Sequence, residues 1–205
     1  MGAAGSIPIQ KQVSFRFSVR SCTTNASYPF TLNQQQIQTL RESWAAIDDK
    51  PGLATAIFKE MFIINPEVRQ TFGLKDVSFQ KFQECTALVN HVTGLETLFD
   101  SLILLLDQEN GDQKCSLVLR RVSQYHVAIN GQTDRIFDPS CWITFLDCAV
   151  QQLCYKMKEL RRKSKKLKGI PWKDIEQVWR IFVTRVVLEI KANYHEQSSA
   201  DAAST

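Results

Sequence analysis

The segment between residues 88 and 105 places its large apolar side chains on one side of a helix. On a wheel of 100° per residue, six residues fall within a stripe roughly 100° wide. They are Leu88, His91, Leu95, Leu98, Leu102 and Leu105. The polar residues Thr93, Glu96, Thr97 and Asp100 lie on the opposite side. A helix with one apolar stripe has to bury that stripe against other elements, so we expect a packed helical fold with a histidine facing its interior.

The same spacing of three and four residues between apolar positions recurs along the chain. Asn33 and Gln36 form an N-x-x-Q capping pattern ahead of one such series. Asn65-Pro66 ends the next series, because proline disfavours helix in the residue before it. The chain has only 8 Gly and 6 Pro, too few for the closely spaced turns of an all-β protein. We predict an all-α domain of about six to eight helices, with the main ones over 33–48, 53–64, 88–105, 115–126, 140–160 and 172–194.

The composition divides the chain into one folded domain and two tails. Residues 1–31 have no sustained periodicity and are rich in Ser, Thr, Gly and Ala, so we expect a flexible N-terminal extension. Residues 196–205 are low in apolar content, and we expect a disordered C-terminal tail. The hydrophobic fraction of 44% is enough for a core, which we assign to residues 32–195.

The formal charge of +4 combines two basic segments with an acidic body. The N-terminal extension carries basic residues and no acid, and residues 156–168 carry many basic residues with Glu159 as their sole acid. Such a cluster binds anionic lipid, contacts nucleic acid or forms a solvated loop. No aromatic residue for base stacking is interleaved in Arg161–Lys168. We therefore expect an anionic membrane surface as a partner, with an inert loop as the next alternative and no nucleic acid.

The first residues, Met1–Ser6, match M-G-x-x-x-[ST], the acceptor pattern for N-myristoylation of Gly2. One myristoyl chain binds membranes only marginally, at roughly 10⁴ M⁻¹, so a second signal is needed. Basic residues near an anionic surface contribute about 1 kcal/mol each, and Cys22 offers an acceptor for palmitoylation. No apolar signal sequence is visible, and the aliphatic run 102–106 is too short to span a membrane. We expect a cytoplasmic protein at the inner face of the plasma membrane.

Only three histidines are present, and two of them are expected to face inward. His91 lies in the apolar stripe described above. His126 shares a stripe with Cys115, Leu119 and Val122 on the next helix. A buried imidazole needs a hydrogen-bond partner or a metal. Each of the two is therefore either a core histidine bonded to a backbone carbonyl or a ligand.

Two inward histidines on successive helices favour the ligand alternative. They would face each other across a gap wide enough for a flat, apolar cofactor. Zinc needs three or four clustered ligands, and the six cysteines contain no CxxC pair or other metal-type spacing. A haem needs only one axial imidazole, with the second above its other face. Phenylalanines on the surrounding helices would form its walls: Phe58, Phe62, Phe72 and Phe99.

Four segments together resemble the globin family, in particular nematode and neuroglobin-like globins. Gln38–Trp44 (QTLRESW) is similar to their first helix. Ala54–Phe72 is similar to the second and short third helices, with Phe-x3-Phe, a proline and a terminal Phe. Leu88–Asp100 resembles the distal helix and Arg121–His126 the proximal helix. The resemblance covers about residues 32–195 and implies a globin fold around a haem pocket.

The resemblance implies a haem b cofactor held by the two histidines. His126 would be the proximal iron ligand and His91 the distal histidine. Phe72 would pack on the haem, Leu95 would lie over the iron, and Phe58 would face the distal pocket from the second helix. Because Phe58 and Leu95 are apolar, His91 is the only polar group expected over the iron.

The same resemblance implies that the chain binds O₂ or another diatomic ligand. His91 either donates a hydrogen bond to bound O₂ or occupies the sixth iron position itself, and neuroglobin-like relatives favour the second arrangement. With the expected membrane tether, this favours oxygen or redox sensing or electron transfer over bulk storage. Two alternatives stay open, a haem-free interaction module with the same fold and a haem-dependent redox enzyme. No Ser-His-Asp set, P-loop or zinc motif indicates a conventional enzyme.

Overall fold

The structure is a computed structural model that describes residues 32–130 and 140–203. Within these residues it contains helices and no strand, so the predicted all-α class is confirmed. The helices are α1 (Gln34–Ala45), α2 (Lys50–Ile64), α3 (Pro66–Thr71), the 3₁₀-helix η1 (Phe79–Glu84), α4 (Thr86–Leu105), α5 (Gly111–Asn130), α6 (Cys141–Lys163), α7 (Lys165–Lys168) and α8 (Trp172–Ala203). The expected acylation sites Gly2 and Cys22 lie outside the described residues, as does the rest of 1–31.

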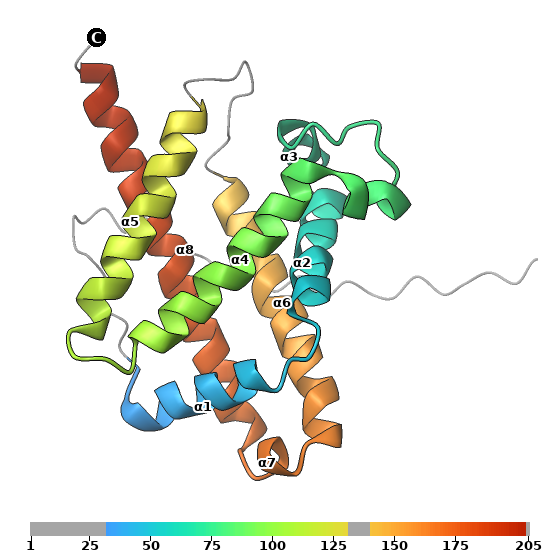
Figure 1. The fold of residues 1–205 in the computed structure, drawn as a ribbon, viewed down its shortest axis with the longest axis vertical. Coiled ribbons are helices and arrows are strands. Elements are labelled where there is room, and N and C mark those ends of the chain that lie inside the picture. The colour runs from blue at the N-terminus through green and yellow to red at the C-terminus, as the bar shows by residue number, and fades with distance from the viewer. Residues whose placement is uncertain (1–31, 131–139, 204–205) are drawn as a thin grey trace, which may run out of the picture.

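Two long helices, α6 and α8, pack against each other in the middle of the bundle. In Figure 1, α4 crosses in front of both, while α5 lies along α8 and α2 packs on α6. α1 packs against α8 near α7. The core that joins α1, α4 and α8 is aromatic, with Trp44, Phe99, Trp179 and Phe182 all buried. The ring of Phe99 lies 5.6 Å from that of Trp44 and 5.2 Å from that of Phe182, so α4 is anchored on α8 through this cluster.

The helix starts follow the capping patterns in the sequence. The Asn33 side chain accepts a hydrogen bond from the Gln36 amide at 2.9 Å, and the Gln36 side chain accepts one from the Asn33 amide at 2.9 Å. This reciprocal pair satisfies two backbone donors that a helix start leaves without intrahelical partners. Asn65 caps α3 with a single hydrogen bond, its side chain accepting from the Glu67 amide at 3.2 Å. The predicted N-terminal box of α1 is therefore confirmed.

The expected disorder of residues 196–205 is wrong for most of that segment, because α8 continues to Ala203. Glu, Gln and Ala are strong helix formers. Extending an existing helix fixes one residue for each hydrogen bond gained, whereas starting a new helix is costly. The Ser199 hydroxyl also donates to the His195 carbonyl at 2.8 Å. A weakly apolar sequence can thus stay helical when it follows a long, buried helix.

The basic segment is also more ordered than the expected loop. α6 runs on to Lys163, and residues 165–168 form the short helix α7. The turn from α6 into α7, here called the α6–α7 corner, is held together by Arg161. Its Nε donates to the Ile170 carbonyl at 3.2 Å and its Nη2 to the Lys168 carbonyl at 3.4 Å. Leu167 is buried beneath the corner. The cations are therefore presented on a folded surface.

α4 is long and apolar enough to cross a membrane by length and composition alone. Core helices of ordinary folded domains meet the same criterion. Leu88 and Leu102 of its predicted inner stripe are buried among the other helices, and so is Phe99, which is not part of that stripe. The apolar stripe of the sequence is thus used for packing within the bundle.

Glu189 of α8 is a buried carboxylate that the predicted site does not use. Its side chain is 3% exposed, and its Oε2 has no hydrogen-bond partner among the described residues. The pKa of this carboxyl group is raised, mainly because burial disfavours the charged form, and the nearby Asp112 raises it further. A hydrogen bond from Ser116 and the charge of Arg185 lower the pKa and offset only part of this shift. The folded protein therefore holds the Glu189 proton more tightly than the unfolded chain does.

We expect Glu189→Gln to remove a pH-dependent loss of stability. The stability from the protonated carboxyl is fully present below its unfolded pKa of about 4.3. It is lost as pH rises through the raised folded pKa. Glu189→Gln should therefore be more stable than wild type at about pH 7 and lose this advantage towards about pH 4. Urea unfolding across this pH range measures the difference, with the exposed Glu109→Gln as control. A stability difference that is constant with pH would contradict the assignment.

Candidate functional site

The structure brings the two inward histidines together. His91 of α4 and His126 of α5 have ring centroids 6.3 Å apart and ring planes inclined at 68°. The two helices pack against each other and are joined by a tight turn. Asn110 in this turn adopts φ 57°, a left-handed conformation that asparagine tolerates better than most residues. The chain reversal thus sets one imidazole from each helix opposite the other.

Both imidazoles are held by the same backbone interaction. Nδ1 of His91 lies 2.8 Å from the Ala87 carbonyl, and Nδ1 of His126 lies 2.8 Å from the Val122 carbonyl. A carbonyl only accepts, so each Nδ1 carries the proton and donates it. The tautomer therefore leaves the lone pair on Nε2, the arrangement that metal-ligating histidines use. The bond also restricts rotation of each ring.

Both histidines are neutral at ordinary pH. Burial lowers the pKa of His91, and the hydrogen bond to Ala87 only partly opposes this shift. Burial likewise lowers the pKa of His126, the bond to Val122 opposes it, and the nearby His91 lowers it further. A neutral imidazole is the protonation state that binds a metal. No proton has to be displaced from Nε2 before binding.

The centroid separation of the two rings is close to that of two imidazoles bound to one metal ion. A metal–imidazole bond is about 2 Å long and the bonded nitrogen lies about 1 Å from the ring centre, so two rings on opposite sides of one ion have centroids about 6 Å apart. The observed separation is 6.3 Å. No group of three His, Cys, Asp or Glu side chains that could hold a metal ion occurs in the described ranges 32–130 and 140–203. The pair therefore suits a metal whose other ligands come from a cofactor.

Aromatic rings surround the histidine pair. Phe72 lies 4.5 Å from the His91 ring and Phe58 lies 6.1 Å from it. These two rings are 5.8 Å from each other, so both phenylalanines lie beside His91, while their expected contacts with a haem stay a prediction. Trp142, near the start of α6, lies 5.0 Å from the His126 ring. The sequence analysis missed Trp142, because apolar spacing alone does not show which side of α6 faces α5.

The described contacts of Phe62, Phe99 and Leu95 are with residues other than the two histidines. Phe99 packs in the aromatic core, with the ring of Trp179 6.4 Å away. It lies two turns beyond His91 on α4, and its part in the wall of a haem pocket stays a prediction. The ring centre of Phe62 lies 5.1 Å from that of Phe72, so the two rings pack against each other. Leu95 is half-buried against the core and lines a separate cavity between α2 and α4.

No family model matches the sequence, and no curated protein is significantly similar to it. Solved structures do match its fold. The globin-like protein Glb-12 of C. elegans aligns with a TM-score of 0.68 at 16% identity, over 83% of this chain and 92% of that chain. A hexacoordinated heme protein of an anhydrobiotic tardigrade aligns with a TM-score of 0.63 at 15% identity, over 81% and 97%. A Drosophila melanogaster globin aligns with a TM-score of 0.61 at 15% identity, over 78% and 93%. The chain has the globin fold.

This globin fold agrees with the resemblance that the sequence motifs indicated. At 16% identity or less the likeness concerns the fold, so the roles of single residues rest on the geometry above. That geometry places a neutral imidazole pair between aromatic walls. The arrangement offers two imidazoles and apolar ring surface to a flat metal cofactor.

Proposed function

We propose that this chain binds haem b, with its iron between His126 and His91. The observation that carries the proposal is the imidazole pair, whose Nδ1 atoms both donate to backbone carbonyls while the rings lie 6.3 Å apart. Phe72, Phe58 and Trp142 offer apolar surface to the faces of a porphyrin. Haem is the cofactor class that combines such walls with axial imidazoles.

His126 takes the proximal role and His91 the distal role. The hydrogen bond from His126 to the Val122 carbonyl fixes its tautomer and raises its basicity as a ligand. Trp142 packs edge-on against the same ring and opposes its rotation. When bound, haem supplies an iron that takes O₂ or another diatomic ligand and exchanges single electrons. The residues on this chain orient the group and exclude water from it.

His91 would occupy the sixth iron position. Its Nδ1 is held by the Ala87 carbonyl and its ring packs against Phe72, which supports an orientation with Nε2 as the metal-binding nitrogen. Two proteins of similar structure are hexacoordinated, the tardigrade heme protein and a Drosophila melanogaster hemoglobin that binds cyanide. In this arrangement His91 would compete with external ligands for the iron, which would slow their binding. This favours oxygen or redox sensing or electron transfer over bulk storage.

The absorption spectrum of the ferrous, CO-free protein tests the proposal. We expect a Soret band with sharp, split visible bands in the wild type, collapsing to one broad band in His91→Leu, because the sixth ligand is lost. His195→Leu is the matched control, since His195 is exposed on α8 and should leave the spectrum unchanged. A broad band in the wild type would mean an open sixth position and reversible O₂ binding. No Soret band after reconstitution would overturn the haem proposal and favour a haem-free interaction module.

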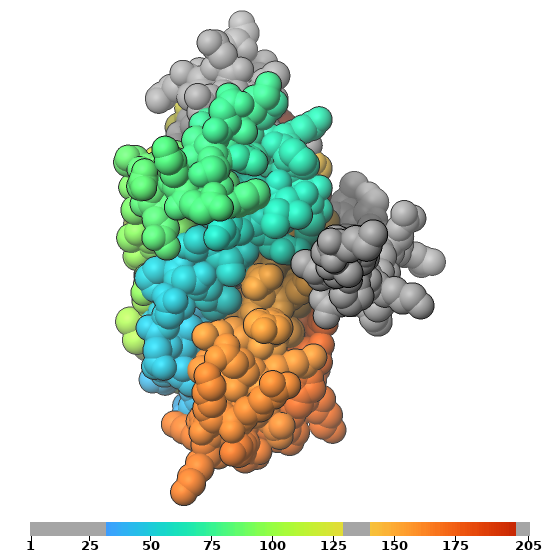
Figure 2. Space-filling model, turned by 90° about the vertical axis from the view of Figure 1, so that its right-hand side faces the viewer, coloured from blue at the N-terminus to red at the C-terminus, as the bar shows by residue number. Residues whose placement is uncertain are grey.

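We also propose that the chain is tethered to the inner face of the plasma membrane. The α6–α7 corner supports this, because Arg162, Lys165, Lys168 and Lys173 are exposed there without a carboxylate partner among the described residues. In Figure 2 this corner forms one end of the molecule. Anionic headgroups would supply the missing counter-charge, and acylation of Gly2 would supply the apolar anchor.

Sedimentation of the full-length, myristoylated protein with vesicles tests the tether. We expect binding to vesicles that contain phosphatidylserine and little binding to purely zwitterionic vesicles. Replacing Arg162, Lys165 and Lys168 with glutamine removes about 1 kcal/mol each and should weaken binding on the order of a hundredfold. The matched control replaces three exposed cations elsewhere, Lys75, Lys81 and Arg120. Equal loss in both triple variants would contradict a specific role for the corner.

A further inference from the structure

The pattern Leu-Arg-Arg-x-Ser occurs twice in the chain, at residues 119–123 and at residues 160–164. Protein kinases with an acidic substrate groove recognise a serine that follows two arginines in this way, because carboxylates of the groove pair with the two guanidinium groups. The sequence alone therefore offers two acceptor serines, Ser123 and Ser164. The fold places these two serines in very different surroundings.

Ser123 is closed to a kinase. It lies within α5, it is fully buried, and its hydroxyl oxygen lies 3.0 Å from the carbonyl oxygens of both Leu119 and Ile190. Ile190 belongs to α8, along which α5 packs. A kinase could reach this hydroxyl only if α5 separated from α8, which would open the core of the bundle.

Ser164 is the accessible copy of the pattern. It is half-buried between the end of α6 and the start of α7, and its backbone is already extended there, with φ −89° and ψ 121°. Its hydroxyl accepts one long hydrogen bond, from the Leu167 amide at 3.3 Å. Helix ends open locally at a lower cost than helix centres. Only the last turn of α6 and the two backbone contacts of Arg161 have to open for a kinase to bind.

We propose that Ser164 is a phosphorylation site for a serine/threonine kinase with an acidic substrate groove, and that its phosphate releases the α6–α7 corner from an anionic membrane. The kinase transfers the γ-phosphoryl group of ATP to Ser164 Oγ. The bond from the γ-phosphorus to the oxygen that bridges it to the β-phosphate breaks, an aspartate of the kinase takes the hydroxyl proton, and ADP leaves. The release from the membrane rests on the proposed tether, whereas the modification itself does not.

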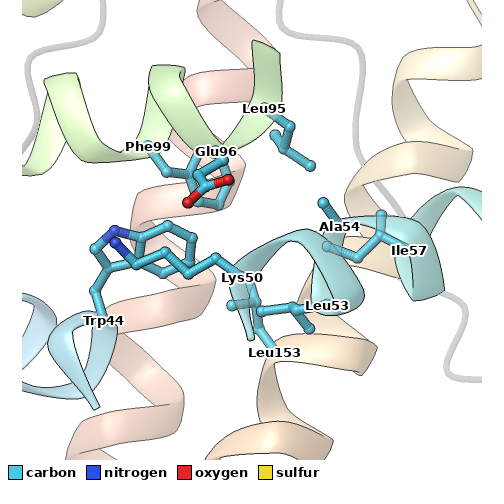
Figure 3. Close-up of a pocket in the computed structure, with 9 residues that line it drawn as sticks. All are labelled: Trp44, Lys50, Leu53, Ala54, Ile57, Leu95, Glu96, Phe99 and Leu153. Atoms are coloured by element: carbon cyan, nitrogen blue, oxygen red, sulfur yellow. The ribbon is translucent and has the colours of Figure 1, made fainter. Parts of the chain in front are cut away.

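The phosphate would lie in the middle of the charges that the proposed membrane contact uses. It adds about 1.5 to 2 negative charges at pH 7, between the exposed cations Arg162 and Lys165. Lys50 shows a different arrangement, because it lies over the Trp44 ring at 4.8 Å and pairs with Asp100 at 2.7 Å (Figure 3). A lysine held in this way already has its counter-charge within the fold. The charges of the corner are the ones that a phosphate on Ser164 would cancel.

Phosphorylation of the full-length, myristoylated protein tests the site. It is incubated with Mg²⁺-ATP and either the catalytic subunit of cyclic-AMP-dependent protein kinase or the catalytic fragment of protein kinase C, two kinases that prefer basic substrates. Mass spectrometry of proteolytic peptides should find phosphate on Ser164 and none on Ser123. Absence of phosphate from Ser164 with both kinases would overturn the site, and phosphate on Ser123 would overturn the selection of one copy by the fold.

Sedimentation with phosphatidylserine vesicles tests the release. Ser164→Asn is the matched control, because asparagine keeps an oxygen that can accept from the Leu167 amide and cannot be phosphorylated. After kinase treatment, the wild type should bind about thirtyfold more weakly than Ser164→Asn, since about two charges of the corner are cancelled. Equal binding of the two kinase-treated proteins would overturn the release.

A second pair of variants needs no kinase. Ser164→Glu adds one negative charge and should weaken vesicle binding about fivefold. Ser78→Glu adds the same charge at another half-buried serine that precedes a short helix, η1. This helix follows α3, which lies at the opposite end of the molecule from α7 (Figure 1), so binding should stay unchanged. Equal weakening in both variants would contradict a specific effect at the corner.

Failure of the release can be distinguished from failure of the tether. If the unmodified wild type does not bind phosphatidylserine vesicles, the tether and the release are both overturned, and the mass spectrum alone decides the modification site. If the unmodified protein binds and its phosphorylated form binds equally well, the tether is supported and the release is overturned.

Discussion

The His126→Ala protein is expected to lose its six-coordinate spectrum and to release haem at least about a hundredfold faster than the wild type. Loss of an outer-shell partner of a metal ligand already costs about 10- to 100-fold in affinity, and His126 is proposed as the ligand itself. Its Nδ1 is held by the Val122 carbonyl and its ring by Trp142, so no neighbouring side chain replaces it. Transfer of haem to an acceptor protein measures the release.

Two comparisons make the His126→Ala result specific. His195→Ala removes the exposed histidine of α8 and should change neither the spectrum nor haem release. Free imidazole added to His126→Ala should restore the six-coordinate spectrum, because the substitution leaves a hole beside Trp142 of about the right shape. An unchanged spectrum in His126→Ala would make this residue a core histidine whose Val122 hydrogen bond serves packing alone.

The sequence indicates the two histidines of the candidate site but not all of the aromatic residues around them. The sequence indicates His91 and His126 because a histidine inside an apolar stripe departs from helical patterning, and it indicates Phe58 and Phe72 because the order of their motifs resembles a known family. Trp142 was missed, since its contact with His126 depends on where the start of α6 lies relative to α5. Helical spacing says which side of a helix is buried. It does not say which neighbour that side meets.

The predicted ends of two helices, α6 and α8, are wrong for a related reason. The segment after His195 and the basic segment before Gly169 look solvent-exposed by composition, and both were expected to lack helix. They are helical because they continue from buried helices, α8 and α6, whose first turns are already formed. Arg161 adds tertiary hydrogen bonds to two backbone carbonyls. Local composition therefore predicts that these segments are exposed to solvent, but it does not predict whether their backbone is helical.

Trp179→Ala is expected to destabilise the haem-free protein by about 3–5 kcal/mol, the usual cost of removing a buried tryptophan. Trp179 is fully buried, and its ring lies 5.8 Å from that of Trp44 and 6.4 Å from that of Phe99. Its Nε1 donates to the Ser43 hydroxyl at 3.0 Å. The substitution thus leaves a cavity among three helices and removes the partner of a buried hydroxyl. Urea unfolding at fixed pH measures the loss.

The matched control is Trp172→Ala. Trp172 is half-buried, with Lys158 5.1 Å above its ring, a contact worth about 0.5–1 kcal/mol at an exposed site. Ser43→Ala separates the two parts of the Trp179 effect. It keeps the ring but leaves Nε1 buried without an acceptor, which costs about 1–3 kcal/mol. A loss in Trp179→Ala no larger than in Trp172→Ala would contradict the assigned core.

We expect Trp179→Ala also to change the positions of the two histidines relative to each other. Phe99 anchors α4 on Trp179 of α8, and His91 lies two turns earlier on the same helix. Loosening this anchor frees α4 to shift, whereas α5 keeps its own contacts with α8 through Ser123, which donates to the Ile190 carbonyl at 3.0 Å. We therefore expect Trp179→Ala to weaken iron coordination by His91 before coordination by His126. A spectrum that mixes six- and five-coordinate forms would show the weaker coordination by His91. An unchanged spectrum in the destabilised variant would mean that contacts at the site hold α4 in position without the Trp179 core.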